Sequence, residues 1–154
     1  MTSRAARFAA AFAALYAAHQ LGDHHVQRDD DAQAKGKPGV AGRAACARHV
    51  ATYTLTCAAA LAATNRVTGA GLRPGRVLAG LVFSAATHYV IDRREPLRRF
   101  AEATGHGGFY RLGMPRPGRD DNPTLGTGAY ALDQSAHVGC LFVAALIAAT
   151  GRRK

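Results

Sequence analysis

The chain has 154 residues, which is enough for one hydrophobic core and one domain. Its formal net charge of +10 is typical of proteins that bind nucleic acid or anionic lipid, but the chain has no Lys/Arg-rich run with interleaved aromatic residues and no zinc-finger spacing, which argues against nucleic acid. The three cysteines lie far apart without CxxC spacing and cannot all pair internally, so we interpret them as small buried apolar residues.

Four segments rich in alanine and leucine are predicted to be helices, and no alternating strand pattern competes with this composition. In chain order they span residues 5–24, 47–65, 75–93 and 131–150. The sequence therefore predicts an all-α fold, with residues 1–154 forming a single up-down four-helix bundle. The connection over residues 93–132 is expected to be a long irregular loop that begins with a short amphipathic surface helix and covers a site.

The apolar stretches of these helices predict a transmembrane bundle with the lipid bilayer as a partner. Each uncharged stretch has about 14 to 17 residues, slightly fewer than the ~20 of a full membrane span, and the polar-faced turn at one end brings each helix close to spanning length. A soluble alanine-rich bundle is the alternative. A cleaved signal peptide is also an alternative for the first helix, although His19 and Asp23 in its cleavage zone match a pattern found elsewhere in the chain.

Histidine and aspartate occur four residues apart at the ends of three predicted helices. The pairs are His19 and Asp23, His88 and Asp92, and, in reversed order, Asp133 and His137. Because residues i and i+4 share one helix face, each pair projects to one side of its helix. His49 opens the second helix, and in an up-down bundle all four of these helix ends meet at the same end of the molecule.

The charges divide between the two ends of the predicted bundle in the same way. All ten acidic residues fall on the side that carries the histidine and aspartate pairs, whereas the opposite side has only basic side chains. Four arginines within residues 93–99 directly follow the third helix and favour a cytoplasmic position for the acidic side.

Imidazole nitrogen and carboxylate oxygen together predict a divalent transition metal, namely Zn, Mn or Fe. The expected metal ligands are His19, Asp23, His88, Asp92 and His137. A metal with an open position acidifies bound water, which predicts hydrolysis of a phosphoester or lipid-like substrate. Asp133 or His49 would act as the general base, and the loop residues Arg116 and Arg119 would bind an anionic substrate or lipid headgroup.

Two other classes of function stay open on the sequence. The polar cluster could be a network of His–Asp hydrogen bonds that fixes helix packing in a non-enzymatic membrane scaffold or accessory protein. The chain could instead be a soluble basic protein that binds nucleic acid or acts as a regulator. Ionisable groups near membrane depth are costly and usually functional, which favours the metal site.

A combination of short motifs resembles an uncharacterised family of small bacterial and phage membrane proteins, a domain of unknown function. The residues that carry the resemblance are His19, Asp23, Gln27, Lys35 or Lys37, His49 and Tyr53, followed by His88 with Asp92 and by Asp133, Gln134 and His137. The resemblance implies a multi-pass protein of the bacterial cytoplasmic membrane without an established activity. The style of the site is more loosely similar to membrane-bound metal-dependent hydrolases, and "DHH" after the first helix departs from the family, where an aromatic residue is commoner.

Overall fold

The computed structural model describes residues 2–115 and 126–151, and every regular element in them is a helix, which confirms the all-α prediction. The elements are α1 (Arg4–Leu21), the π-helix η1 (Gly22–Val26), α2 (Asp29–Ala34), α3 (Gly39–Thr68), α4 (Pro74–Asp92), α5 (Glu95–Ala103), α6 (Gly107–Tyr110) and α7 (Thr127–Ala149).

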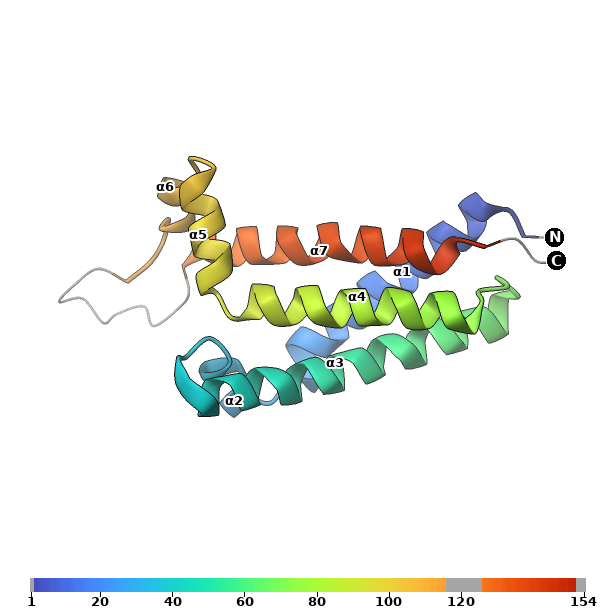
Figure 1. Ribbon diagram of the computed structural model, residues 1–154, viewed down its shortest axis with the longest axis horizontal. Helices are drawn as coiled ribbons and strands as arrows, with labels where there is room; N and C mark the ends of the chain where they lie inside the picture. The colour runs from blue at the N-terminus through green and yellow to red at the C-terminus, as the bar shows by residue number, and fades with distance from the viewer. Residues whose placement is uncertain (1, 116–125, 152–154) are drawn as a thin grey trace.

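Four long helices, α1, α3, α4 and α7, lie side by side and alternate in direction along the chain (Figure 1). Each packs against two others, in the order α1, α3, α4, α7 and back to α1. The short elements η1, α2, α5 and α6 gather at the end of this bundle opposite the chain termini (Figure 1). We call that end the polar end.

The connections contain more helix than the sequence predicts. α3 begins at Gly39, where Pro38 in an extended conformation ends the preceding turn, whereas the expected start was residue 47. Residues 29–34 form α2, which was not predicted. Three aspartates in its first turn stabilise this helix because their negative charges lie near the positive end of the helix dipole. The segment 93–132, expected to be mostly irregular, contains both α5 and α6, although residues 116–125 lie outside the described part of the chain.

The helices pack through small side chains. Half of the residues in the main buried cluster are alanines, and Leu15, Leu61 and Leu141 are among its larger members. Gly80 on α4 lies at a close approach to α7, because a Cβ atom there would lie 2.8 Å from the carbonyl oxygen of Ala144. Small residues allow two helix backbones to approach in this way.

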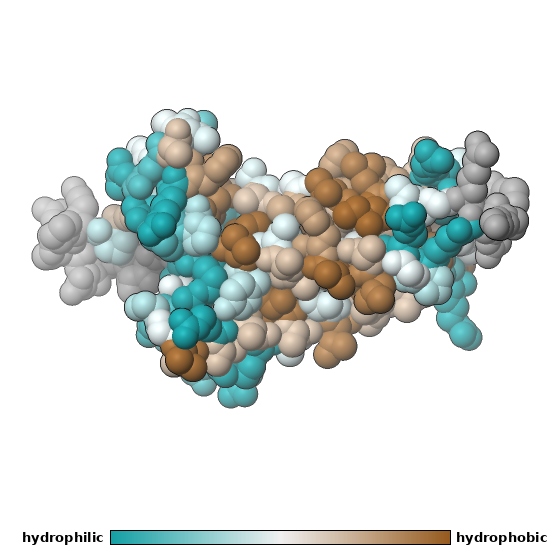
Figure 2. Space-filling view, viewed as in Figure 1, coloured by the Kyte–Doolittle hydropathy of each residue, from teal (hydrophilic) through white to brown (hydrophobic). Residues whose placement is uncertain are grey.

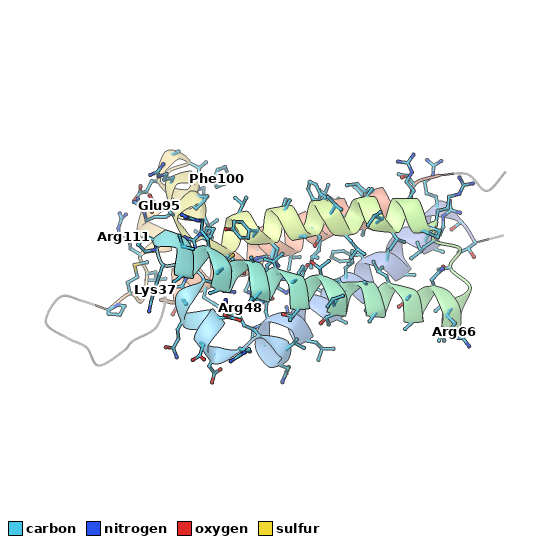
Figure 3. The ribbon with its side chains drawn as sticks, turned by 60° about the horizontal axis from the view of Figure 1, so that its bottom comes forward. Lys37, Arg48, Arg66, Glu95, Phe100 and Arg111 are labelled. Carbon is cyan, nitrogen blue, oxygen red and sulfur yellow. The ribbon has the colours of Figure 1, made fainter. Side chains whose placement is uncertain are left out.

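Large apolar side chains lie instead on the outside of the bundle. Exposed examples occur on all four long helices, including Tyr16 on α1, Leu55 on α3, Leu78 and Val82 on α4, and Phe142 on α7. In the space-filling view the hydrophobic colour occupies the middle of the molecule and hydrophilic side chains occupy both ends (Figure 2). Charged residues such as Lys37 and Arg111 lie at the polar end and Arg66 at the other (Figure 3).

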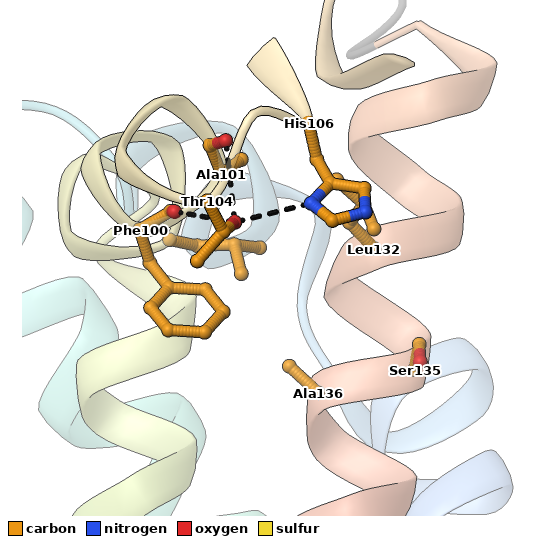
Figure 4. Close-up of a pocket in the computed structure, with 8 residues that line it drawn as sticks. Phe100, Ala101, Thr104, His106, Leu132, Ser135 and Ala136 are labelled. Carbon is orange, nitrogen blue, oxygen red and sulfur yellow. Dashed lines mark hydrogen bonds between the residues drawn. The ribbon is translucent and has the colours of Figure 1, made fainter.

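An apolar groove of about 310 Å³ lies between α5 and α7. Phe100 on α5 and Ala136 on α7 line it from opposite sides (Figure 4). The end of α5 beside the groove is held by the Thr104 hydroxyl, which donates to the carbonyl oxygen of Phe100 at 2.8 Å and lies 3.1 Å from Nδ1 of His106. The amphipathic surface helix expected after residue 93 therefore forms one wall of a groove.

Among the described helices, only α7 is long and apolar enough to cross a membrane by length and composition. The predicted four membrane spans are therefore not supported by this criterion.

The contact between α4 and α7 can be tested at Gly80. We expect Gly80→Ala to lower the free energy of unfolding by about 1–3 kcal/mol, because the new methyl group must separate two backbones. The matched control is Gly139→Ala on α7, where a Cβ atom meets nothing within 4 Å and the change should be neutral or stabilise by up to ~1 kcal/mol. Thermal unfolding checks both variants, and equal midpoints would contradict the close approach.

Candidate metal centre

Histidine and aspartate side chains from five helical elements meet inside the polar end of the bundle. They are His19 on α1, Asp23 on η1, His49 on α3, His88 and Asp92 on α4, and His137 on α7. The four histidines and Asp92 are each at most 2 % exposed. The structure thus brings together all five expected metal ligands and His49.

The π-helix η1 carries Asp23 one turn beyond His19 and keeps the two side chains together, with Nε2 of His19 3.5 Å from Oδ2 of Asp23. Gly22 allows η1 to lie close to α3, because a Cβ atom there would come within 3.1 Å of the Tyr53 ring. π-helical turns are uncommon and occur often at functional sites.

The tightest group of ligand atoms comes from α3, α4 and η1. Nε2 of His49 lies 2.9 Å from Nε2 of His88, and each of these nitrogens lies 3.2 Å from Oδ2 of Asp92. Both nitrogens also lie 3.5 Å from Oδ1 of Asp23. Metal–ligand bonds of ~2.0–2.2 Å place neighbouring ligand atoms roughly 3.0–3.6 Å apart, so these separations suit the shell of one transition metal.

A second group adjoins the first and shares two of its residues. His19, Asp23, His88 and His137 each offer one ligand atom, and these atoms all lie within 4.8 Å of one another. The Asp23 carboxylate faces both groups, since Oδ1 points toward His49 and His88 while Oδ2 points toward His19. The residues could therefore hold one metal ion, or two that share a carboxylate.

Several buried atoms of this cluster have no hydrogen-bond partner among the described residues. They are both ring nitrogens of His19, Oδ1 of Asp23, Nδ1 of His88, Oδ2 of Asp92 and Nε2 of His137. Buried polar groups in native proteins are almost always paired. A group of unpaired nitrogen and oxygen atoms in one place therefore indicates a bound species that completes them.

Neighbouring groups orient two of the histidines. In the amide orientation that satisfies its surroundings, Gln27 accepts a hydrogen bond from Nδ1 of His49 at 3.2 Å. Nδ1 of His137 donates to the backbone carbonyl of Asp133 at 2.9 Å. Each arrangement leaves the Nε2 lone pair facing the cluster, as in metal sites where the second ring nitrogen of a ligand donates to an oxygen.

Lys35 connects the α2 region to the cluster. Its ammonium group lies 2.7 Å from Oδ1 of Asp92, which leaves Oδ2 of that carboxylate to face His49 and His88. The same ammonium donates to the Gln27 amide oxygen at 3.0 Å. Arg93 holds the turn after Lys35 in place by donating to the backbone carbonyls of Lys35 and Lys37.

The positive environment also affects Asp23, which lies in η1 beyond the end of α1. Burial opposes its ionisation, but the imidazole of His49 at 3.5 Å and the nearby His88, His19 and Lys35 together lower the pKa of the Asp23 carboxyl to about 2. Asp23 is therefore a carboxylate at neutral pH and available as a ligand.

Some roles differ from those expected from the sequence. His49, expected as a general base, lies among the ligand atoms, whereas Asp133 is partly exposed beside His137 and lines a polar pocket over the cluster. Arg116 and Arg119, the expected substrate-binding residues, lie outside the described residues. Lys35 was expected at the site only from the family motif, because no helical spacing links it to Asp92.

The Lys35–Asp92 ion pair predicts that substitution of Lys35 and of Lys37 will change the free energy of unfolding by very different amounts. Because the pair is largely buried, Lys35→Met should lower the free energy of unfolding of the metal-free protein by roughly 3–5 kcal/mol, the effect of leaving a buried charge unpaired. Lys37→Met removes an exposed lysine two residues away and should change it by less than about 0.5 kcal/mol. Chemical denaturation measures both, and similar effects would show that Lys35 does not support Asp92.

Comparisons with known proteins identify a family but no activity. Residues 11–152 match the family model described as "Protein of unknown function (DUF3307)". No curated protein and no solved structure matches the chain. The matched region includes every residue of the cluster described above, and the chain belongs to this family of unknown function.

Proposed function

We propose that this protein is an integral membrane protein whose polar end binds at least one divalent transition metal and hydrolyses a phosphoester. The observation that carries the proposal is the set of buried, unpaired histidine and aspartate atoms that surround one small volume. A purely structural hydrogen-bond network would be expected to pair these atoms with one another.

The chemistry follows from the ligands and their neighbours. His49, His88, Asp92 and Asp23 form the better-matched ligand group, and a mixture of imidazole and carboxylate suits Zn, Mn or Fe. A divalent metal held by these residues would act as a Lewis acid and would supply an acidified water near neutral pH.

In this proposal Asp133 would act as the general base. It lies at the edge of the cluster, in the pocket that leads to Asp23 and Asp92. In hydrolysis, the water oxygen forms a bond to phosphorus while the bond from phosphorus to the leaving oxygen breaks. Asp133 accepts a proton from the attacking water, and that proton passes to the leaving oxygen, so the net reaction adds one water to the ester.

The distribution of apolar side chains supports the membrane part of the proposal. Large apolar residues such as Leu55, Leu78 and Phe142 face outward, and alanines make up half of the main buried cluster, whereas a soluble bundle keeps most of its large apolar side chains inside. Only 28 % of the apolar window of α7 is buried, so α7 is not the enclosed core helix of a soluble protein. The charges at both ends would lie in the two headgroup regions.

Metal content tests the proposed site. We expect the full chain, purified in detergent, to contain a near-stoichiometric transition metal, because five buried ligands and the partly buried Asp23 converge there. His88→Ala should lose most of it, while His106→Ala, at an exposed position outside the cluster, should keep it. Plasma mass spectrometry measures the metal, and hydrolysis of an aryl phosphodiester should follow the metal content. A folded wild-type protein that stays empty after Zn, Mn and Fe are offered would contradict the proposal.

The proposed membrane insertion predicts different outcomes when two exposed apolar residues of α3 are replaced by arginine. Leu55, 70 % exposed, lies in the middle of the bundle, whereas Val40, 73 % exposed, lies at its polar end. Arginine at Leu55 should cost about 2.5–3.5 kcal/mol in a bilayer and reduce the fraction that resists alkaline extraction from membranes. Val40→Arg should leave that fraction unchanged. If the wild type and both variants are all recovered in the soluble fraction without detergent, the protein does not span a membrane.

A further inference from the structure

A polar pocket of about 170 Å³ lies directly over the metal-binding cluster. Asp23, Asp92 and Asp133 line its inner side, and Gln27, Lys35 and Arg94 are among its other lining residues. The ammonium group of Lys35 is already bound to Asp92 and Gln27. Arg94 is therefore the cation of this pocket whose charge has no carboxylate partner among the described residues.

The Arg94 side chain is fixed at one nitrogen and open at the others. Nη2 donates to the carbonyl oxygen of Ala32 at 3.1 Å, which anchors the guanidinium against α2. Within the described part of the chain, its Nε and Nη1 make no hydrogen bond, although the side chain is only partly exposed. An anchored guanidinium with free N–H groups is suited to bind the oxygens of a phosphoryl group.

The backbone at Arg94 is strained in a way that glycine would avoid. Arg94 has φ +60° and ψ −46°, and it is the one non-glycine residue in the described ranges with a positive φ. Side chains other than glycine seldom adopt this conformation, and it persists where surrounding structure enforces it, often at functional sites. The strained turn between α4 and α5 places the Arg94 side chain toward α2 and the pocket.

Gly36 makes room for the same side chain. A Cβ atom at Gly36 would lie 2.5 Å from Cδ and 2.7 Å from Nε of Arg94, so any larger residue must push the guanidinium aside. Two separate features, the strained backbone of Arg94 and the absence of a side chain at Gly36, thus allow the Arg94 guanidinium to lie where it does.

We infer that Arg94 binds a non-bridging oxygen of the substrate phosphoryl group while the phosphorus lies over the metal centre. This inference rests on the proposed function, because the carboxylates of Asp23, Asp92 and Asp133 would repel an anion unless a divalent cation neutralised them. The substrate class is a phosphoester, either water-soluble or the headgroup of a phospholipid. Arg94 is a binding residue and takes no part in proton transfer.

Phosphate binding to the metal-loaded full chain in detergent tests the inference. We expect inorganic phosphate, followed by calorimetry, to bind the wild type and to bind Arg94→Ala at least tenfold more weakly. Arg94→Lys should restore only part of the affinity, because ammonium lacks the fork of N–H groups. Arg99→Ala is the matched control: this arginine is 75 % exposed, pairs with Glu95 and should leave phosphate binding unchanged.

A second variant keeps the test independent of the arginine itself. Gly36→Ala retains every charge but displaces the guanidinium, and it should weaken phosphate binding in the same direction as Arg94→Ala. Metal content is measured on every variant, so that a loss of phosphate through loss of metal is recognised. If Arg94→Ala does not keep its metal, Gly36→Ala and Arg94→Lys decide the outcome.

The possible results separate the inference from the proposed function. Metal-loaded Arg94→Ala, Arg94→Lys and Gly36→Ala that bind phosphate as tightly as the wild type would overturn the role of Arg94 and leave the metal site standing. A wild type that takes up no metal would overturn the proposed function, and with it the inference. Competition between inorganic phosphate and micelles containing phosphatidic acid then identifies the source: displacement indicates a lipid headgroup, and its absence indicates a water-soluble ester.

Discussion

The Asp92 carboxylate is the group on which the polar end of this protein depends. One of its oxygens is bound by Lys35, and the other faces the Nε2 atoms of His49 and His88. Because a buried carboxylate must be neutralised by nearby partners, this single group ties the α2 region, α3 and α4 to one point. The ion pair with Lys35 also determines which oxygen is left for a metal.

Alanines make up half of the main buried cluster in the interior of the bundle. Alanine and Gly80 allow the helices to lie close together. Because the helices are close, the short histidine and aspartate side chains meet at the polar end. Larger core residues would separate the helices and with them the ligand atoms. The packing that exposes large apolar side chains is therefore the same packing that assembles the site.

The short elements of the polar end complete the site in ways the long helices cannot. η1 extends the chain past α1 and presents Asp23, and the turn after α2 brings Lys35 over Asp92. The junction of α4 and α5 places Arg94 against the same turn, where Gly36 leaves space for it. The four candidate histidine ligands and Asp92 come from the long helices, whereas Asp23, Lys35 and Arg94 come from the segments that connect them.

The sequence by itself determined the helical class and the meeting of the histidine and aspartate pairs at one end, because both follow from local rules. Composition favours helix, an interval of four residues defines a helix face, and alternating helix directions bring His19, His88 and His137 to one end. Only the tertiary structure decided that His49 lies among the candidate ligand atoms, that Lys35 pairs with Asp92 and that Arg94 faces the pocket. These contacts join residues far apart in the chain, and they depend on helix separation and on a strained turn, neither of which any local spacing encodes.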